Sequence, residues 1–102
     1  MLCKIKPDKK DVWLDWCHEI IEVHSKESLE TLIEEDLISE KCTVLSSEAG
    51  DYLIYEHESI DERKKKPANL DKELNKKHFE KFHECLELIG GKNILGYELR
   101  VP

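Results

Sequence analysis

The residue with the clearest chemical potential is a histidine on the apolar stripe of a predicted helix. His78 lies four residues after Leu74 and four before Phe82, on the face that an amphipathic helix buries. An imidazole titrates near neutral pH and can accept or donate a proton. A second histidine, His24, ends the stripe of an earlier predicted helix, and Glu27 follows it by three residues. His78 is therefore the candidate acid/base, with His24 and Glu27 as candidate ligand-binding residues.

Aromatic side chains supply the remaining candidates for a ligand-binding pocket. They are Trp16, Tyr52, Tyr55 and Phe82. In one hypothesis, Tyr52 or Tyr55 acts with Glu27 to orient a small-molecule substrate for His78, without an organic cofactor. In the other, these side chains complete the core, and His78 forms hydrogen bonds to a backbone carbonyl or another side chain and does nothing further.

Other kinds of site have weaker support. His24, Glu27 and His78 have the residue types of a metal site with two imidazoles and one carboxylate, but the usual ligand spacing is absent. We therefore predict neither a metal nor a cofactor. Gly90-Gly91 follows a predicted helix instead of opening one, so this pair cannot form a phosphate-binding loop at a helix N-terminus.

The four cysteines are scattered along the chain. Cys3, Cys17, Cys42 and Cys85 include no C-x-x-C pair, and free cysteine is commonly buried as a small apolar residue. We expect reduced thiols that pack in the interior.

Size and charge restrict the class of protein. The chain has 102 residues, enough for one domain (1–102), with 39% hydrophobic and 38% charged residues. Its formal net charge of −7 opposes non-specific binding to nucleic acid, although Arg63–Lys66 forms a local basic run. No apolar run approaches the ~20 residues of a membrane span, and the N-terminus lacks the apolar region of a signal peptide. The expectation is a cytoplasmic protein that binds neither nucleic acid nor membrane.

The apolar pattern predicts the elements that position these residues. A second helix starting at Ser28 is favoured over a kink in the first, because the apolar stripe changes phase near residues 25–28. The predicted elements are a strand at 2–7, a helix from about 8 to 24, a helix from 28, strands at 38–45 and 51–60, a helix from 69 or 71 to 89, and a strand at 94–101. This order predicts an α+β fold of the ferredoxin-like β-α-β-β-α-β type, with helices on one face of a four-stranded antiparallel sheet.

One strand is apolar on both sides, which has consequences for assembly. In the stretch 51–60, Tyr52 and Ile54 alternate with Leu53 and Tyr55, and a strand with two apolar faces is usually covered on both. The helices can cover only one face of the sheet. We therefore expect a homodimer that packs through the open face.

Residues 27–61 resemble a family of small bacterial proteins without an assigned activity. The most specific part is GDYLIY at 50–55, and Glu27 with Thr31-Leu32 is similar as well. Asp36 stands where that family more often has glycine, and aspartate tolerates the left-handed conformation. The resemblance implies a dimeric α+β barrel, a superfamily that includes cofactor-free enzymes and proteins without known activity.

Two functional hypotheses follow. The favoured one is a non-catalytic dimeric interaction or sensing module. The alternative is a small-molecule-binding protein or cofactor-independent enzyme of the dimeric α+β barrel type, with His78 as acid/base.

Overall fold

The apolar patterns of the chain form seven elements in the computed structural model, which describes residues 1–61 and 66–102. In chain order they are β1 (Leu2–Ile5), α1 (Lys10–Glu22), α2 (Ser25–Glu34), β2 (Leu37–Ser47), β3 (Gly50–Ser59), α3 (Glu73–Cys85) and β4 (Leu86–Leu88). The α+β class is confirmed.

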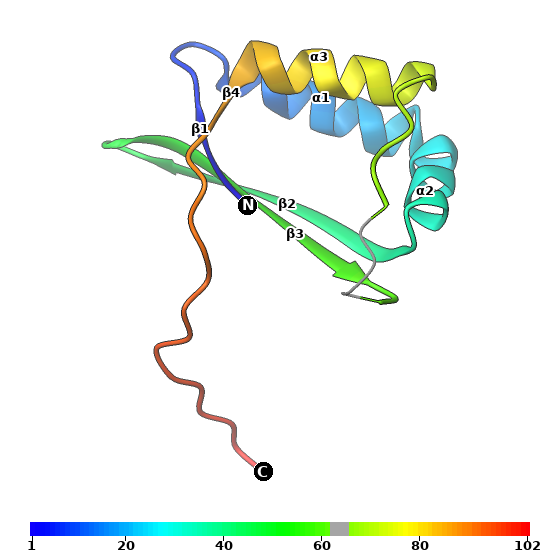
Figure 1. Ribbon diagram of the computed structural model, residues 1–102. Coiled ribbons are helices and arrows are strands. Elements are labelled where there is room, and N and C mark those ends of the chain that lie inside the picture. Colours follow the sequence, from blue (N-terminus) through cyan, green and yellow to red (C-terminus); the bar gives the residue numbers. More distant parts are fainter. Residues whose placement is uncertain (62–65) are drawn as a thin grey trace.

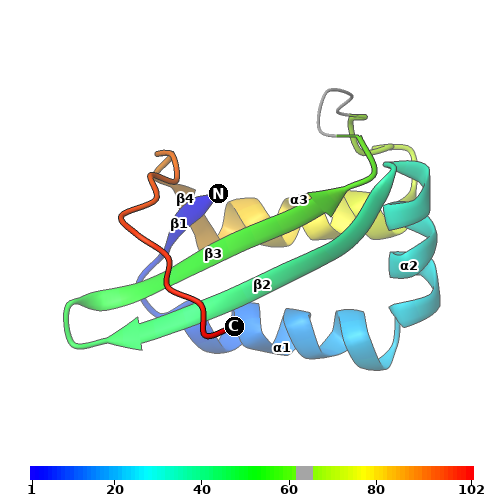
Figure 2. The same cartoon turned by 90° about the horizontal axis from the view of Figure 1, so that it is seen from below.

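The strands form one four-stranded sheet in the order β2-β3-β1-β4, and all neighbouring pairs are antiparallel. A tight turn joins β2 to β3, with Ser47 paired to Gly50. Gly50 has a φ of 133°, which side chains rarely adopt. Helices α1 and α3 lie side by side across one face of the sheet, and α2 lies at one end (Figures 1 and 2). A four-stranded antiparallel sheet is thus confirmed, while α2 is an addition to the β-α-β-β-α-β order.

The core lies between the sheet and the helices α1 and α3. Its buried members are Cys3, Ile5, Trp13, Trp16, Leu53, Tyr55, Cys85 and Leu86. The two tryptophans are one turn apart on α1, so both side chains point at the sheet. This small core depends heavily on large aromatic side chains.

The predicted final strand at 94–101 is wrong. The fourth strand is Leu86–Leu88, within the stretch predicted as the end of the last helix. Leu86 has extended backbone dihedral angles and pairs with Ile5 of β1. This pairing buries the Leu86 side chain in the core and provides hydrogen-bond partners for the outer backbone groups of β1. Residues 89–102 are in neither a helix nor a strand.

Helix starts also differ from those predicted. The second helix is separate from the first, as predicted, but it starts at Ser25 instead of Ser28. The last helix starts at Glu73, because Asn69 accepts a hydrogen bond from the Asp71 N–H in a turn that precedes it. After α2, Asp36 has a φ of 56°, so aspartate does hold the left-handed conformation here.

The face of the sheet opposite the helices is partly apolar. Side chains alternate along a strand, so residues one position away from the buried ones point to this open face. Leu2 of β1 lies opposite Ile54 of β3 there, and Leu45 of β2 lies opposite Tyr52. Ile54 is 41% exposed and Leu45 is 59% exposed.

Candidate functional site

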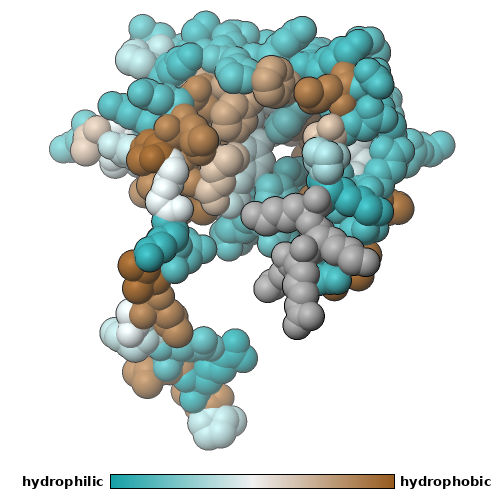
Figure 3. Space-filling view, in the orientation of Figure 1, coloured by the Kyte–Doolittle hydropathy of each residue, from teal (hydrophilic) through white to brown (hydrophobic). Residues whose placement is uncertain are grey.

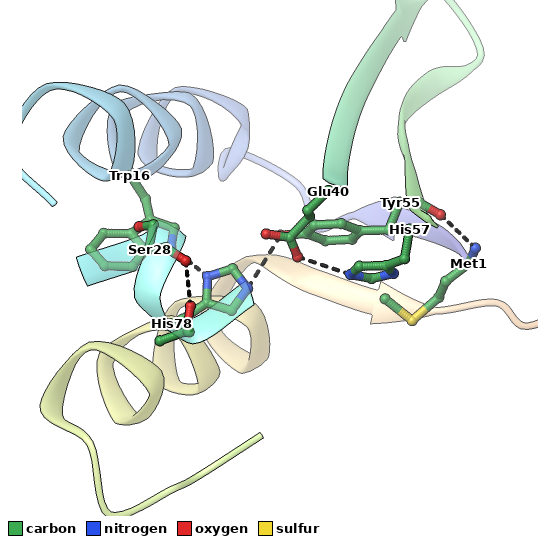
Figure 4. Close-up of polar contacts among 8 residues, drawn as sticks. Met1, Trp16, Ser28, Glu40, Tyr55, His57 and His78 are labelled. Atoms are coloured by element: carbon green, nitrogen blue, oxygen red, sulfur yellow. Dashed lines mark hydrogen bonds and ion pairs between the residues drawn. The ribbon is translucent and has the colours of Figure 1, made fainter. Parts of the chain in front are cut away.

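His78 projects from α3 into the space between α1 and the sheet, where two aromatic side chains bind its ring (Figure 4). The Trp16 Nε1–H donates to His78 Nδ1 at 3.0 Å. Because Nδ1 is the acceptor, the proton of the neutral ring lies on Nε2, which is 3.3 Å from the Tyr55 hydroxyl. Both ring nitrogens therefore have partners inside the protein.

The surroundings favour the neutral form of His78. Burial lowers the pKa of the ring, and the nearby negative charge of Glu40 opposes this effect. The ring centroid is 6.0 Å from that of Trp13, 6.1 Å from that of Trp16 and 6.2 Å from that of Tyr55. Burial also raises the pKa of the Tyr55 hydroxyl above its usual range, so this hydroxyl stays protonated and is no general base.

A second polar pair lies at the other side of Tyr55. Glu40 on β2 and His57 on β3 are cross-strand neighbours, and the Glu40 Oε1 to His57 Nε2 distance is 3.0 Å. The His57 ring stacks on the Tyr55 ring, with centroids 6.0 Å apart and planes 4° apart. Tyr55 thus separates a partly exposed His–Glu pair from the half-buried His78.

A narrow cleft opens beside His78, with a volume of about 100 Å³. Its lining residues come from the three helices, from β2, and from the segments that precede β2 and α3. They are Trp16, Ile20, Ser28, Thr31, Leu32, Glu35, Glu40, Ala68, Leu74, Asn75 and His78. Ligand pockets for drug-sized molecules have at least ~300 Å³, so only a few non-hydrogen atoms fit here.

Two carboxylates give the cleft an acidic character. Burial raises the pKa of Glu35, and the negative charge of Glu40 raises it further. Glu35, Glu40 and Asn75 were not predicted as site residues. The pairing of Glu40 with His57 follows from the β2–β3 register, which the turn residues fix, and a hairpin alignment of the sequence would have found it.

His24 and Glu27 lie in another hollow, next to α3. The distance from His24 Nδ1 to Glu27 Oε1 is 4.0 Å, and the His24 ring lies 6.1 Å from the ring of Trp16. Lys76 and Lys77 are further lining residues of this hollow, which His78 does not line. The two candidate histidines therefore line different hollows, and the Trp16 ring is a neighbour of both.

The other candidates are divided between the two faces of the sheet. Tyr55 points to the helices and contacts His78, whereas Tyr52 points to the open face. Side chains alternate between the two faces of a strand, so residues three positions apart point to opposite faces. Phe82 packs against the core and does not line the cleft. Of the candidates, the structure brings together His78, Trp16 and Tyr55.

No metal site forms among residues 1–61 and 66–102, where no three histidine, cysteine, aspartate or glutamate side chains come close enough to hold an ion. All four cysteines are free. Cys17 of α1 and Cys42 of β2 are neighbours, and a hydrogen bond between the thiols raises the pKa of Cys17 and lowers that of Cys42.

The basic run falls mostly outside the described residues. Arg63, Lys64 and Lys65 belong to the part that the structure does not describe. Lys66 is described, and its Nζ is 2.8 Å from Asp36 Oδ2. Among the helices of the described chain, none combines the length and apolar character needed to cross a bilayer.

Fold and site together define an α+β protein in which helices cover a four-stranded antiparallel sheet around a half-buried histidine. Residues 1–96 match the model of a family of unknown function, DUF6176, and the chain belongs to this family. No curated protein and no solved structure matches the chain.

Proposed function

We propose that the protein is a non-catalytic homodimeric interaction or sensing module of the cytoplasm, with a ferredoxin-like subunit and the assembly of a dimeric α+β barrel. The sheet order and the two helices on one face support the subunit fold. Four free thiols are consistent with a reducing compartment.

The observation that carries the proposal is the apolar open face of the sheet. Leu2, Leu45 and Ile54 are exposed there, and α1 and α3 are both on the opposite face (Figure 2). A second copy related by a two-fold axis would cover these side chains with the same side chains of its own sheet. Burial of apolar area is the main driving force for such contacts.

The geometry of His78 supports a non-catalytic role for this half-buried histidine. A general base needs a free nitrogen within hydrogen-bond distance of the proton that it removes. Trp16 and Tyr55 bind both nitrogens of His78, so the ring links α1, β3 and α3 instead of facing a substrate.

The proposal is tested by the association state of the Ile54→Asp variant. Analytical ultracentrifugation should show a concentration-dependent dimer for the native sequence and a shift toward monomer for the variant. Ile21→Asp is the matched control, because Ile21 is exposed on α1 away from the sheet. A native chain that stays monomeric at all concentrations, or an Ile54→Asp variant that associates normally, would contradict the proposal.

The cleft supports a second function, the binding or conversion of a small molecule. Here Glu35, Glu40 and His78 line a space of about 100 Å³. The pKa of Glu35 is raised and that of His78 is lowered, and acid/base groups with shifted pKa values are typical of functional sites. His78 would act as acid/base after release of its bond to Tyr55. The test is the Tyr55→Phe variant, which frees Nε2: ligands of a few non-hydrogen atoms should then shift the NMR signals of His78, while an unchanged spectrum would exclude this function.

A further inference from the structure

The C-terminal segment after β4 has the pattern of a strand but no partner strand among the described residues of its own chain. In this segment, residues 94–101 (the arm), Leu95, Tyr97, Leu99 and Val101 alternate on one side. These four side chains are between 76% and 96% exposed. After the bond from the Ile89 N–H to the Leu2 carbonyl, no backbone hydrogen bond joins residues 90–102 to the described part of the chain. The arm leaves the sheet on the side away from the helices, and hydrophobic residues follow its length (Figures 1 and 3).

The sheet has one long edge that matches an arm of this length. Because the strand order is β2-β3-β1-β4, β2 pairs on only one side, and its 11 residues leave an open row of backbone donors and acceptors. Eight residues of extended chain span roughly 26 Å, which fits along this edge. Natural proteins usually protect such an edge with proline, charge or a bulge. β2 contains no proline, its bulge lies at the start between Leu37 and Ser39, and its charged residues are Glu40 and Lys41.

The arm cannot reach this edge within its own chain. The outer side of β2 is four strand spacings from β4, which is roughly 19 Å. From Ile89, which is bonded to Leu2, the linker 90–93 makes five Cα–Cα steps to Ile94 and spans at most about 18 Å when fully extended, which is still short of that distance. The nearer edge, that of β4, has only three residues and cannot pair an eight-residue strand.

We infer that the arm of each copy pairs with the outer edge of β2 in a second copy, which extends each sheet to five strands. The inference rests on the proposed homodimer and specifies how its two chains are joined. Two-fold symmetry makes the exchange reciprocal, so one dimer has two such junctions. The apolar side of the arm, with Leu95, Tyr97, Leu99 and Val101, continues the open face at Leu45 and is buried in the same interface.

The first test uses the full-length native protein in a mixed-isotope NMR sample, with one copy labelled on its amides and the other on its carbons. Nuclear Overhauser contacts between labelled β2 amides and arm protons of the other copy are expected. Contacts only within one chain would overturn the inference.

The second test is Leu99→Asp in the full-length chain. Leu29→Asp is the matched control, because it introduces the same charge at an exposed leucine of α2. In Leu99→Asp the dimer should dissociate at least tenfold more readily, and the outer amides of β2 should exchange hydrogen at least tenfold faster. The control should behave as the native chain does.

The outcomes separate this inference from the proposed function. If the native dimer persists without contacts between arm and β2, and Leu99→Asp behaves as native, the exchange is wrong and the dimer stands. If the native chain is a monomer at every concentration, both are wrong.

Discussion

At the scale of single residues, His78 shows how a titratable ring fits on the apolar side of a helix. The ring accepts a hydrogen bond from the Trp16 indole and is within hydrogen-bond distance of the Tyr55 hydroxyl. Without it, the buried Trp16 N–H would be unpaired, which is unfavourable, and the Tyr55 hydroxyl would keep only its hydrogen bond with Cys42. The histidine therefore completes the core chemically as well as sterically.

Replacing His78 tests this role. His78→Leu leaves the Trp16 N–H without its partner and removes one of the two side-chain hydrogen bonds of the Tyr55 hydroxyl, so the free energy of unfolding should fall by about 1–3 kcal/mol. His78→Gln is the control, because its amide can still accept one hydrogen bond and donate another, and it should lose less. Chemical denaturation monitored by tryptophan fluorescence measures both. A leucine variant as stable as the native chain would contradict a role for these bonds.

The lowered pKa of His78 predicts a pH dependence of stability. In the unfolded chain the pKa of the ring is about 6.5, and in the folded chain burial lowers it. The unfolded state therefore binds more protons below pH 6.5, and stability is lost as the pH falls from 6.5 toward the folded pKa, at up to about 1.4 kcal/mol per pH unit.

The check is a comparison of native and His78→Gln stabilities at several pH values from 8 to 5. The difference between them should change below pH 6.5, with the native chain losing more. Using the difference removes the contributions of groups such as Glu35, whose pKa is shifted the other way. A constant difference would mean that the ring protonates equally in both states.

Sequence reasoning identified His78 on its stripe but not its partners. Trp16 is 62 positions away along the chain, so the pair exists only once α1 and α3 pack together. Alternation places Tyr52 and Tyr55 on opposite faces of β3, yet which of them faces the helices depends on the fold. The hairpin register pairs Glu40 with His57, but the place of Glu40 beside the cleft depends on which face of β2 the helices cover.

At the scale of elements, the pattern predicted the hairpin and the separate α2, but it misplaced the fourth strand. Leu86 and Ile89 fit the apolar spacing of a helix, so the pattern predicts a helix that continues past Cys85. Pairing of Leu86 with Ile5 is a long-range contact that helical periodicity cannot reveal. The stretch 94–101 has a strand pattern, but a strand also needs a neighbour, and residues 1–61 and 66–93 offer none that fits.

The short strand β4 makes a direct prediction for two leucines. Leu86 is 4% exposed and Leu88 is 58% exposed. Leu86→Ala should lower the free energy of unfolding by about 2–4 kcal/mol, and the control Leu88→Ala by less than about 1 kcal/mol. Thermal and urea denaturation measure both. Equal effects would argue against the described packing of β4.

At the scale of the whole molecule, the net charge opposes dimer formation and the exposed apolar surface favours it. The chain carries a formal charge of −7, so two copies repel. The open face and the arm provide apolar side chains that are exposed in the single chain. Association through these surfaces must therefore depend on how strongly the repulsion is screened.

The salt dependence of dimerisation distinguishes an apolar interface from one held by ion pairs. Charges interact over a Debye length of ~30 Å at 0.01 M salt but only ~10 Å at 0.1 M. Added sodium chloride therefore removes most of the repulsion between the two chains. The dimer should dissociate less readily at 0.3 M than at 0.01 M salt in analytical ultracentrifugation, and the midpoint of thermal unfolding should rise with protein concentration, because association stabilises the folded state. An interface built on charges such as Glu98 and Arg100 of the arm would instead weaken with salt, and that result would contradict burial of the apolar side of the arm.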